Sequence, residues 1–306
     1  MARQAYSSFW EILTKKMEHK NEAMTSTKVN KVELCDDLVK INLDEIWSSI
    51  KNSAIETAAK EHCLRQMLED VVISRDSLAD SLAVRLARRL ARPDMERSEL
   101  ELLLTGLFRG NNKLIRMVAS DMEAIVDRDP ACQSALEPLL FYKGFLAISA
   151  YRVAHHLWLE DRKALAYYFQ SVVSEVFAVD IHPAATIGCG ILLDHATSFV
   201  VGETSIIEND VSILHEVTLG GTGKVTGDRH PIIKSGVLIG AGAKILGRVT
   251  IGECAKVGAG SVVLKSVPAH TTVAGVPAEE ICKNAENPAL DMNQQLFESL
   301  TEANAI

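Results

Sequence analysis

Aliphatic residues recur at every sixth position over the second half of the chain. The series starts at Ile181 and ends at Val263, with one slip of two residues and one longer interruption. A helix repeats every 3.6 residues and a flat strand every two, so neither explains this spacing. The thirteen positions are Ile181, Ile187, Leu193, Val201, Ile207, Ile213, Leu219, Ile233, Ile239, Ile245, Ile251, Val257 and Val263.

A coil with three short strands in each turn does explain the spacing. Each aliphatic side chain then points into a triangular prism, and successive turns stack at roughly 4.8 Å. Fifteen of the eighteen glycines lie between 188 and 275, where such a chain must turn in little room. We therefore predict a β-helix over residues 178–277.

The region before the coil, residues 41–177, has helical spacing instead. Apolar residues from Leu43 to Ile50 follow the i, i+3, i+4, i+7 pattern, and Ser77 can cap a helix that ends before Pro93. Further helices are expected over 98–108, 114–126, 135–159 and 162–177. An α-helical domain thus leads into the coil without a Gly/Ser linker. It is flanked by a variable N-terminal extension (1–40), and a polar C-terminal tail (278–306), expected to be mobile, follows the coil.

Composition narrows the class of protein. The net charge is -8, from 32 basic and 40 acidic residues, which argues against a nucleic-acid partner and against an anionic membrane surface. No uncharged apolar run approaches the roughly 18 residues of a membrane span, and the polar start does not resemble a secretory signal. Six cysteines are scattered without a CxxC pair, so we expect a reduced, cytoplasmic protein.

Polar residues that could carry chemistry gather at the start of the coil and in its interruption. Asp180 and His195 stand fifteen residues apart, three short of a full turn, which brings them near one edge of adjacent strands. A carboxylate that holds one imidazole nitrogen leaves the other free to act as a base on an alcohol.

Two other interpretations of these residues stay open. The histidines could be ordinary edge residues, or they could bind zinc. His182, His195, His215 and His230 are spaced by 13, 20 and 15 residues, which fits no short-loop zinc pattern. Subunits of a β-helical trimer can nevertheless assemble ligands between them, so spacing alone does not decide.

Charge is distributed unevenly along the coil. Residues 178–223 contain six acidic and no basic residues, whereas residues 224–270 contain seven basic and two acidic ones. An acidic end suits the ammonium group of a small substrate, and a basic end suits a cosubstrate that carries phosphates. The alternative is a surface of solvated lysines.

Several strings in this region together resemble the bacterial and plant serine O-acetyltransferases. They are DIHPAA, LDHAT, VVGETSIIENDVSIL, VTLGGTGK, GDRHP, IGAGAKILG, VGAGSVV and AGVPA, and the resemblance runs from about Asp129 to Pro277. It implies an α+β fold in which an N-terminal α-helical domain precedes a left-handed parallel β-helix and a flexible C-terminal tail. It also implies acetyl transfer from acetyl-CoA to the hydroxyl of L-serine, the first step of cysteine biosynthesis, without a metal.

The resemblance assigns roles to individual residues. His195 would be the general base and Asp180 would orient it. Asp194 and Asp129 would hold the serine ammonium. Arg229 and His230 would hold its carboxylate or help to stabilise the anionic intermediate. Gly221, Ala241, Gly242, Lys256 and Ala259 would line the CoA groove.

Partners follow from the same resemblance. A β-helix with uncovered apolar faces already suggests at least a trimer, and the family pairs trimers into hexamers. L-cysteine would inhibit the enzyme at the serine site. Ile306 would insert into O-acetylserine sulfhydrylase, although Asn304-Ala305 departs from the usual ending. Ser198 also departs from the family, which usually has glycine there.

Three alternatives belong to other classes. One is a hexapeptide acyltransferase for a sugar or an amine. The second is a metal-dependent hydratase similar to γ-class carbonic anhydrase. The third is a scaffold that binds the sulfhydrylase through Ile306 and catalyses nothing.

Overall fold

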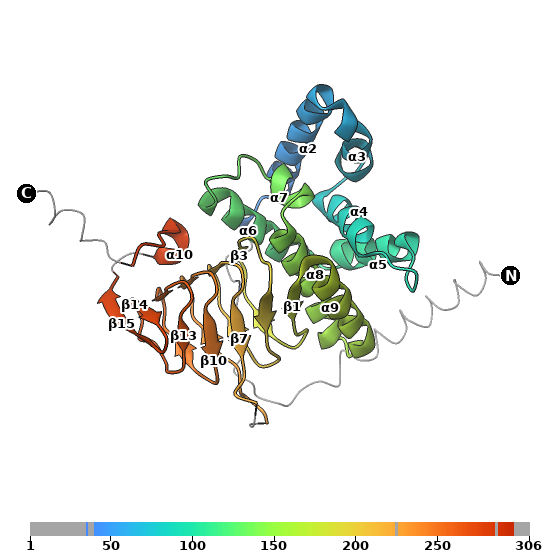
Figure 1. The fold of residues 1–306 in the computed structure, drawn as a ribbon. Helices are drawn as coiled ribbons and strands as arrows, with labels where there is room; N and C mark the ends of the chain where they lie inside the picture. Colours follow the sequence, from blue (N-terminus) through green and yellow to red (C-terminus); the bar gives the residue numbers. More distant parts are fainter. Residues whose placement is uncertain (1–34, 36–39, 224–225, 285–286, 297–306) are drawn as a thin grey trace, which may run out of the picture. The chain divides into compact units, whose positions relative to one another are not determined.

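The protein consists of helices followed by a coil of short strands (Figure 1). The structure, a computed structural model, describes residue 35 and residues 40–223, 226–284 and 287–296. The helices are α2 (Leu43–Lys60), η2 (His62–Leu64), α3 (Arg65–Leu68), η3 (Glu69–Ile73), α4 (Leu78–Leu90), α5 (Arg97–Gly110), α6 (Asn112–Arg128), α7 (Leu136–Leu140), α8 (Lys143–Leu159), α9 (Lys163–Phe177) and α10 (Pro288–Asp291). None of them combines the length and apolar character that a membrane span needs, within the described residues.

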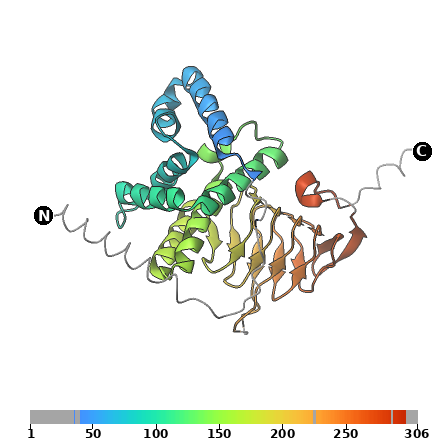
Figure 2. The same cartoon turned by 180° about the vertical axis from the view of Figure 1, so that it is seen from behind.

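The strands form three parallel sheets, which Figures 1 and 2 show as stacked turns. Their orders are β1-β4-β7-β10-β13, β2-β5-β8-β11 and β3-β6-β9-β12-β14, and β15 joins the last sheet antiparallel to β14. The strands are β1 (Val179–Ile181), β2 (Thr186–Ile187), β3 (Leu192–Leu193), β4 (Phe199–Val201), β5 (Ile206–Ile207), β6 (Ser212–Ile213), β7 (Thr218–Gly220), β8 (Ile232–Ile233), β9 (Leu238–Ile239), β10 (Lys244–Leu246), β11 (Thr250–Ile251), β12 (Lys256–Val257), β13 (Val262–Val263), β14 (Thr271–Gly275) and β15 (Ala278–Lys283).

The predicted β-helix is confirmed by the positions of its aliphatic residues. All thirteen are buried, at 5% exposure or less. They form three columns in register, one for each sheet. Ile181 pairs with Val201 and Ile187 with Ile207, while Leu193 pairs with Ile213 in the third column. Each side chain therefore stacks on its equivalent in the next turn and excludes water from the prism.

The helical part follows the sequence in its caps and differs in one long helix. Ser77 caps α4 as expected, because its side chain accepts a hydrogen bond from the Asp80 amide. The helix predicted over 135–159 is instead two helices, α7 and α8, separated at 141–142. The break redirects α8 so that Gly144 lies directly against the β-helix. A Cβ at Gly144 would lie 2.0 Å from the Leu193 carbonyl oxygen, so only glycine permits this contact.

Helix α8 also supplies hydrogen bonds to the first turn of the coil. Tyr151 donates to the carbonyl of Ala185 at 2.5 Å, and Arg152 donates to that of Gly188 at 2.7 Å. His155 Nδ1 lies 2.8 Å from the carbonyl of Pro183. These contacts join the helices to the coil, and α9 ends at Phe177 two residues before β1 begins.

A buried ion pair lies at the centre of this junction. Arg152 and Asp121, on α8 and α6, are joined by two hydrogen bonds of 2.6 and 2.7 Å, and their side chains are 2% and 0% exposed. Asp121 also accepts the amide of Ile191 at 2.9 Å. Burial opposes the charge on Arg152, but the adjacent carboxylate outweighs it and holds the pKa of the guanidinium above its usual value.

The described part of the chain beyond Pro277 forms a strand and a short helix, and it packs on the coil. Strand β15 pairs with β14, and Asn284 accepts a hydrogen bond from Thr272 at 3.1 Å. The segment then packs back on the coil, where Ser212 donates to the carbonyl of Ala289 at 2.8 Å. The predicted boundary at 277 therefore falls inside a hairpin.

Asp121→Asn should unfold the protein at markedly lower urea concentration. Removing the carboxylate charge leaves Arg152 buried without a counter-charge, which costs about 3–5 kcal/mol of unfolding free energy. Glu101→Gln serves as the control, since Glu101 pairs with Arg75 at 3.5 Å and both side chains are 28% exposed. That variant should lose at most about 1 kcal/mol. Equal losses in the two variants would contradict a central role for the buried pair.

Candidate active site

One edge of the prism, after the sheet that contains β3, carries a column of predicted site residues. Each lies two positions beyond an inward aliphatic residue, in the register of β3, β6, β9 and β12. The column consists of His195, His215, Ala241 and Ala259, and we call it the histidine edge. Gly242 follows on the same edge and donates its amide to the His215 carbonyl at 2.9 Å.

The corner that holds His195 explains the slip of two residues in the repeat. It is longer than the equivalent corner at His215, and three of its residues have left-handed backbones: His195 (φ 55°), Ala196 (φ 61°) and Ser198 (φ 60°). Left-handed geometry favours glycine, which is the residue that the resemblance led us to expect at position 198. The long corner pushes His195 outward, and its side chain is 73% exposed.

His195 has acidic and aromatic neighbours. Its Nε2 lies 3.8 Å from Oδ2 of Asp194, and its ring centre lies 5.6 Å from that of His215. Asp180 lies in β1 and accepts a hydrogen bond from Gln170 Nε2 on α9 at 2.7 Å. Both Asp180 and His195 are described, and the structure records no direct contact between them. The expected dyad therefore stays a prediction.

The second edge, after the sheet that contains β4, carries Gly221, Arg229 and His230 of the predicted residues. Glu203 and Thr204 form its corner, and the excursion from Gly220 to Pro231 leaves the coil one turn further on. Arg229 donates to Glu203 at 2.7 Å, and this hydrogen bond lowers the pKa of the Glu203 carboxyl. We call this group, with His230, the loop edge.

His230 is held firmly inside the loop edge. It is only 7% exposed, and its Nδ1 lies 3.2 Å from the amide nitrogen and 2.9 Å from the hydroxyl of Thr204. Its ring lies against Gly202, where a Cβ would come within 2.0 Å of Nε2. Burial, reinforced by the charge of Arg229, lowers the pKa of His230 and favours the neutral ring.

His182 lies beside the loop edge and packs between aromatic rings. Its ring centre is 5.3 Å from that of Trp158 and 5.6 Å from that of Tyr167. Its Nδ1 accepts the amide of Ala184 at 3.1 Å. Burial lowers its pKa, against the charges of Glu203 and Asp180, which raise it. The ring therefore favours its neutral form.

The two edges flank one face of the prism and do not meet within the chain. Strand β4 separates them, and three residues at roughly 3.3 Å each span about 10 Å. Asp129 is in neither group. It ends α6 and accepts the amide of Ala131 at 2.9 Å. The chain thus supplies the predicted residues as separate sets.

Ion pairs cross the boundary between the expected acidic and basic ends of the coil. Stacking places acids of one turn against bases of the next: Lys234 pairs with Glu208 at 2.6 Å, just as Arg229 pairs with Glu203. Lys256, predicted to bind CoA, is buried, and its ammonium donates to the carbonyl of Gln295 at 2.9 Å. In the basic segment, Arg229, Lys234 and Arg248 pair with acidic side chains. Lys244 and Lys256 instead donate to backbone carbonyls.

The four histidines proposed as an alternative zinc site are divided in the same way. His195 and His215 lie on the histidine edge, while His182 and His230 lie on or beside the loop edge. Within the described part of the chain, no three His, Cys, Asp or Glu side chains come together as a metal site.

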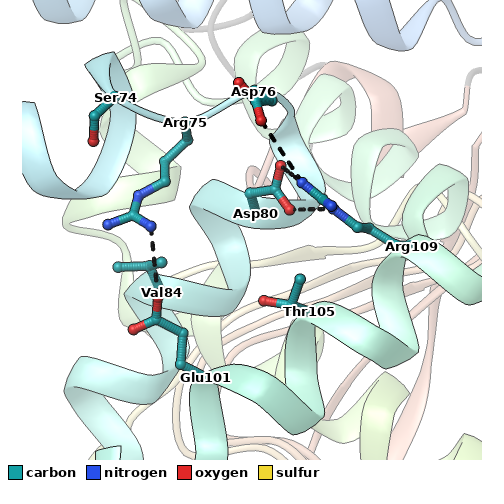
Figure 3. Close-up of a pocket in the computed structure, with 8 residues that line it drawn as sticks. All are labelled: Ser74, Arg75, Asp76, Asp80, Val84, Glu101, Thr105 and Arg109. Carbon is teal, nitrogen blue, oxygen red and sulfur yellow. Dashed lines mark hydrogen bonds and ion pairs between the residues drawn. The ribbon is translucent and has the colours of Figure 1, made fainter. Parts of the chain in front are cut away.

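A cavity of about 230 Å³ lies elsewhere, in the helical domain (Figure 3). Its charged residues face one another, with Arg109 on Asp80 at 2.6 Å and Arg75 on Glu101 at 3.5 Å. None of the predicted site residues lines it. Because its charges are satisfied internally, the two edges of the coil remain the better candidate site.

Three residues of the site were missed by sequence reasoning. Gln170 contacts Asp180, Glu203 contacts Arg229, and Thr204 contacts His230. Gln170 gave no signal, because it lies in an ordinary helix. The position of Thr204 in the repeat was a weak signal. It follows the inward residue Val201 by three positions, and its turn of the coil is adjacent to the excursion.

Comparisons with known proteins agree on one family. The model for the N-terminal region of serine acetyltransferase matches residues 46–150, and the model for bacterial transferase hexapeptide repeats matches residues 230–265. A serine acetyltransferase of Haemophilus influenzae is 49% identical over 251 residues, which cover 82% of this chain and 94% of the relative.

Solved structures extend the likeness to the fold. A serine acetyltransferase of Brucella abortus in complex with coenzyme A has a TM-score of 0.78 at 47% identity, covering 81% of this chain and 99% of that one. A serine acetyltransferase in complex with cysteine has a TM-score of 0.80 at 49% identity, covering 82% and 98%. With identity near one half over most of its length, this chain belongs to the serine acetyltransferase family.

Proposed function

We propose that this protein is an acetyltransferase that moves the acetyl group of acetyl-CoA to the hydroxyl of L-serine, giving O-acetyl-L-serine and CoA. The observation that carries the proposal is the 49% identity to a serine acetyltransferase over 82% of the chain. The CoA-bound relative supports the cosubstrate. The exposed His195 supports the chemistry, because an accessible imidazole can accept a proton from an alcohol.

The reaction needs one base and no covalent acetyl-enzyme. His195 Nε2 takes the proton of the serine hydroxyl while the oxygen attacks the thioester carbonyl. The C–S bond then breaks, and the CoA thiolate receives that proton from the imidazolium. Asp180 orients His195, and Gln170 would keep the Asp180 carboxylate in place through its 2.7 Å hydrogen bond.

The substrates would lie along the two edges. Asp194 and Asp129 bind the serine ammonium, and Arg229 and His230 bind its carboxylate. CoA binds along Gly221, Ala241, Gly242 and Ala259, whose small side chains leave room for the pantetheine chain. Lys256 fits this role least well, because its ammonium is already bound to Gln295.

Completing the site calls for a second subunit. The histidine edge and the loop edge border the same face of one prism, so they come together when faces of neighbouring prisms meet around a threefold axis. We propose a trimer on this ground, and a hexamer formed by the helical domains on the family resemblance.

Three further expectations rest on the family. The cysteine-bound relative supports inhibition by L-cysteine at the serine site. Binding of O-acetylserine sulfhydrylase through Ile306 stays a prediction, because residue 306 lies outside the described residues. Cytoplasmic localisation also stays a prediction.

His195→Asn should abolish serine-dependent CoA release. Asparagine tolerates the left-handed backbone at this corner but cannot act as the base, so kcat should fall by roughly 10²–10⁴-fold. His215→Gln, one turn away on the same edge, is the matched control and should retain activity. Assays with L-serine, L-homoserine and a sugar would identify the acceptor. Release with another acceptor but not with serine would refute the substrate, and unchanged rates in His195→Asn would refute the base.

Gly202→Ala should raise the KM for serine by tenfold or more while the protein stays folded. The added Cβ would lie 2.0 Å from His230 Nε2 and so displaces the imidazole from the site. Gly106→Ala is the control, because nothing lies within 4 Å of its Cβ position in α5. It should leave activity unchanged and stabilise the helix slightly. An unchanged KM in Gly202→Ala would show that His230 does not bind serine.

A further inference from the structure

We propose that Thr204 fixes the tautomer of His230, so that the ring stays neutral with its hydrogen on Nε2 and donates that hydrogen to the anionic group of the substrate. Thr204 is thus a positioning residue that acts through His230. The inference rests on the proposed function for the identity of the substrate, whereas the tautomer itself follows from hydrogen bonds within the chain.

The Thr204 hydroxyl has all of its hydrogen-bonding capacity in use. Its oxygen accepts the amides of Arg229 at 3.0 Å and of His230 at 3.2 Å. A threonine hydroxyl has two lone pairs and one hydrogen. Both lone pairs are taken by amides, so the hydrogen is left for the remaining neighbour, His230 Nδ1, at 2.9 Å.

The backbone amide of Thr204 supports the same assignment. Its amide nitrogen lies 3.2 Å from His230 Nδ1, and an amide can only donate. Nδ1 must therefore present its lone pair, and a hydrogen on Nδ1 would face two donors. The neutral ring then carries its hydrogen on Nε2.

The surroundings keep the ring neutral and leave Nε2 without a partner among the described residues. Arg229, Arg248 and His182 face the ring, and their positive charges oppose its protonation, while Glu203 favours it. Burial has the largest effect and also lowers the pKa of His230. Among the described residues none accepts a hydrogen bond from Nε2. The ring nitrogen lies over Gly202 and beside Gly221, where a Cβ would come within 2.0 and 3.3 Å.

The two histidines of the site therefore have opposite roles, one as a proton acceptor and the other as a hydrogen-bond donor. His195 must present a lone pair to remove a proton, and His230 must present a hydrogen to a carboxylate or to the oxyanion that forms on the acetyl group. A neutral donor in a buried place avoids the desolvation that a second imidazolium would cost. Both residues are histidines, and Thr204 determines which ring nitrogen of His230 carries the hydrogen.

Ring-¹⁵N-labelled histidine tests the tautomer directly in the intact protein. The His230 signals are assigned by their loss in His230→Gln, among nine histidines. We expect an unprotonated, pyridine-type nitrogen at Nδ1 and a protonated, pyrrole-type nitrogen at Nε2. A hydrogen on Nδ1, or a doubly protonated ring at pH 7, would overturn the proposal. This readout does not depend on acetyl transfer, so it separates the proposal from the assigned reaction.

Substitutions at Thr204 then test its role. Thr204→Val removes the hydroxyl at nearly constant volume and leaves the backbone amide as the one remaining donor to Nδ1 among the described residues. A detectable fraction of the other His230 tautomer should then appear, with a rise of up to roughly tenfold in the KM for serine. Thr204→Ser keeps all three hydrogen bonds and should restore the single tautomer and most of the affinity. An unmixed tautomer in Thr204→Val would overturn the role of the hydroxyl.

A matched control distinguishes this role from general packing. Ser205 is the next residue, is 1% exposed, and its hydroxyl finds no partner among the described residues. Ser205→Ala should keep the wild-type tautomer and KM. If Ser205→Ala shifts the tautomer as much as Thr204→Val does, the effect belongs to the packing of the corner and the proposal fails.

Discussion

The first turn of the β-helix has no turn before it, and its backbone groups need partners that stacking supplies elsewhere. Helices provide them. Arg152 and Tyr151 donate to carbonyls of this turn, and Arg128 of α6 donates to that of Gly190 at 3.0 Å. Asp121 takes the amide of Ile191 and holds Arg152 in place. An unpaired buried carbonyl or amide costs about 1–3 kcal/mol, so this cover is a condition for the rest of the coil.

The helices that cover the first turn also determine where the proposed site residues lie. Asp180 and His195 belong to the first turn and the corner that follows it, next to the helices rather than in the middle of the coil. Helix α9 reaches Asp180 through Gln170. The residues proposed for proton transfer therefore stand on a part of the coil whose position is set by α6, α8 and α9.

The sequence predicts those features that local spacing determines. The inward column from Ile181 to Val263 was readable because every turn places one residue at each equivalent position. The break between α7 and α8 was not readable, because it depends on the contact of Gly144 with Leu193, which are far apart in the sequence. The ion pairs could not be predicted for the same reason. Glu208 and Lys234 are 26 residues apart in the sequence, because the excursion lengthens that turn. The choice of hydrogen-bond partners, as between Thr204 and His230, needs coordinates.

The excursion from Gly220 to Pro231 enters and leaves the coil without disturbing the columns on either side. Leu219 still pairs with Ile245, and Ile233 still pairs with Ile207. This corner of the coil holds a long inserted segment while the inward columns keep their register, and Thr204 is the scaffold residue that contacts the end of that segment. Acceptor preference could therefore be exchanged between related coils by transplanting one corner segment, together with the threonine that anchors it, while every inward aliphatic residue stays as it is.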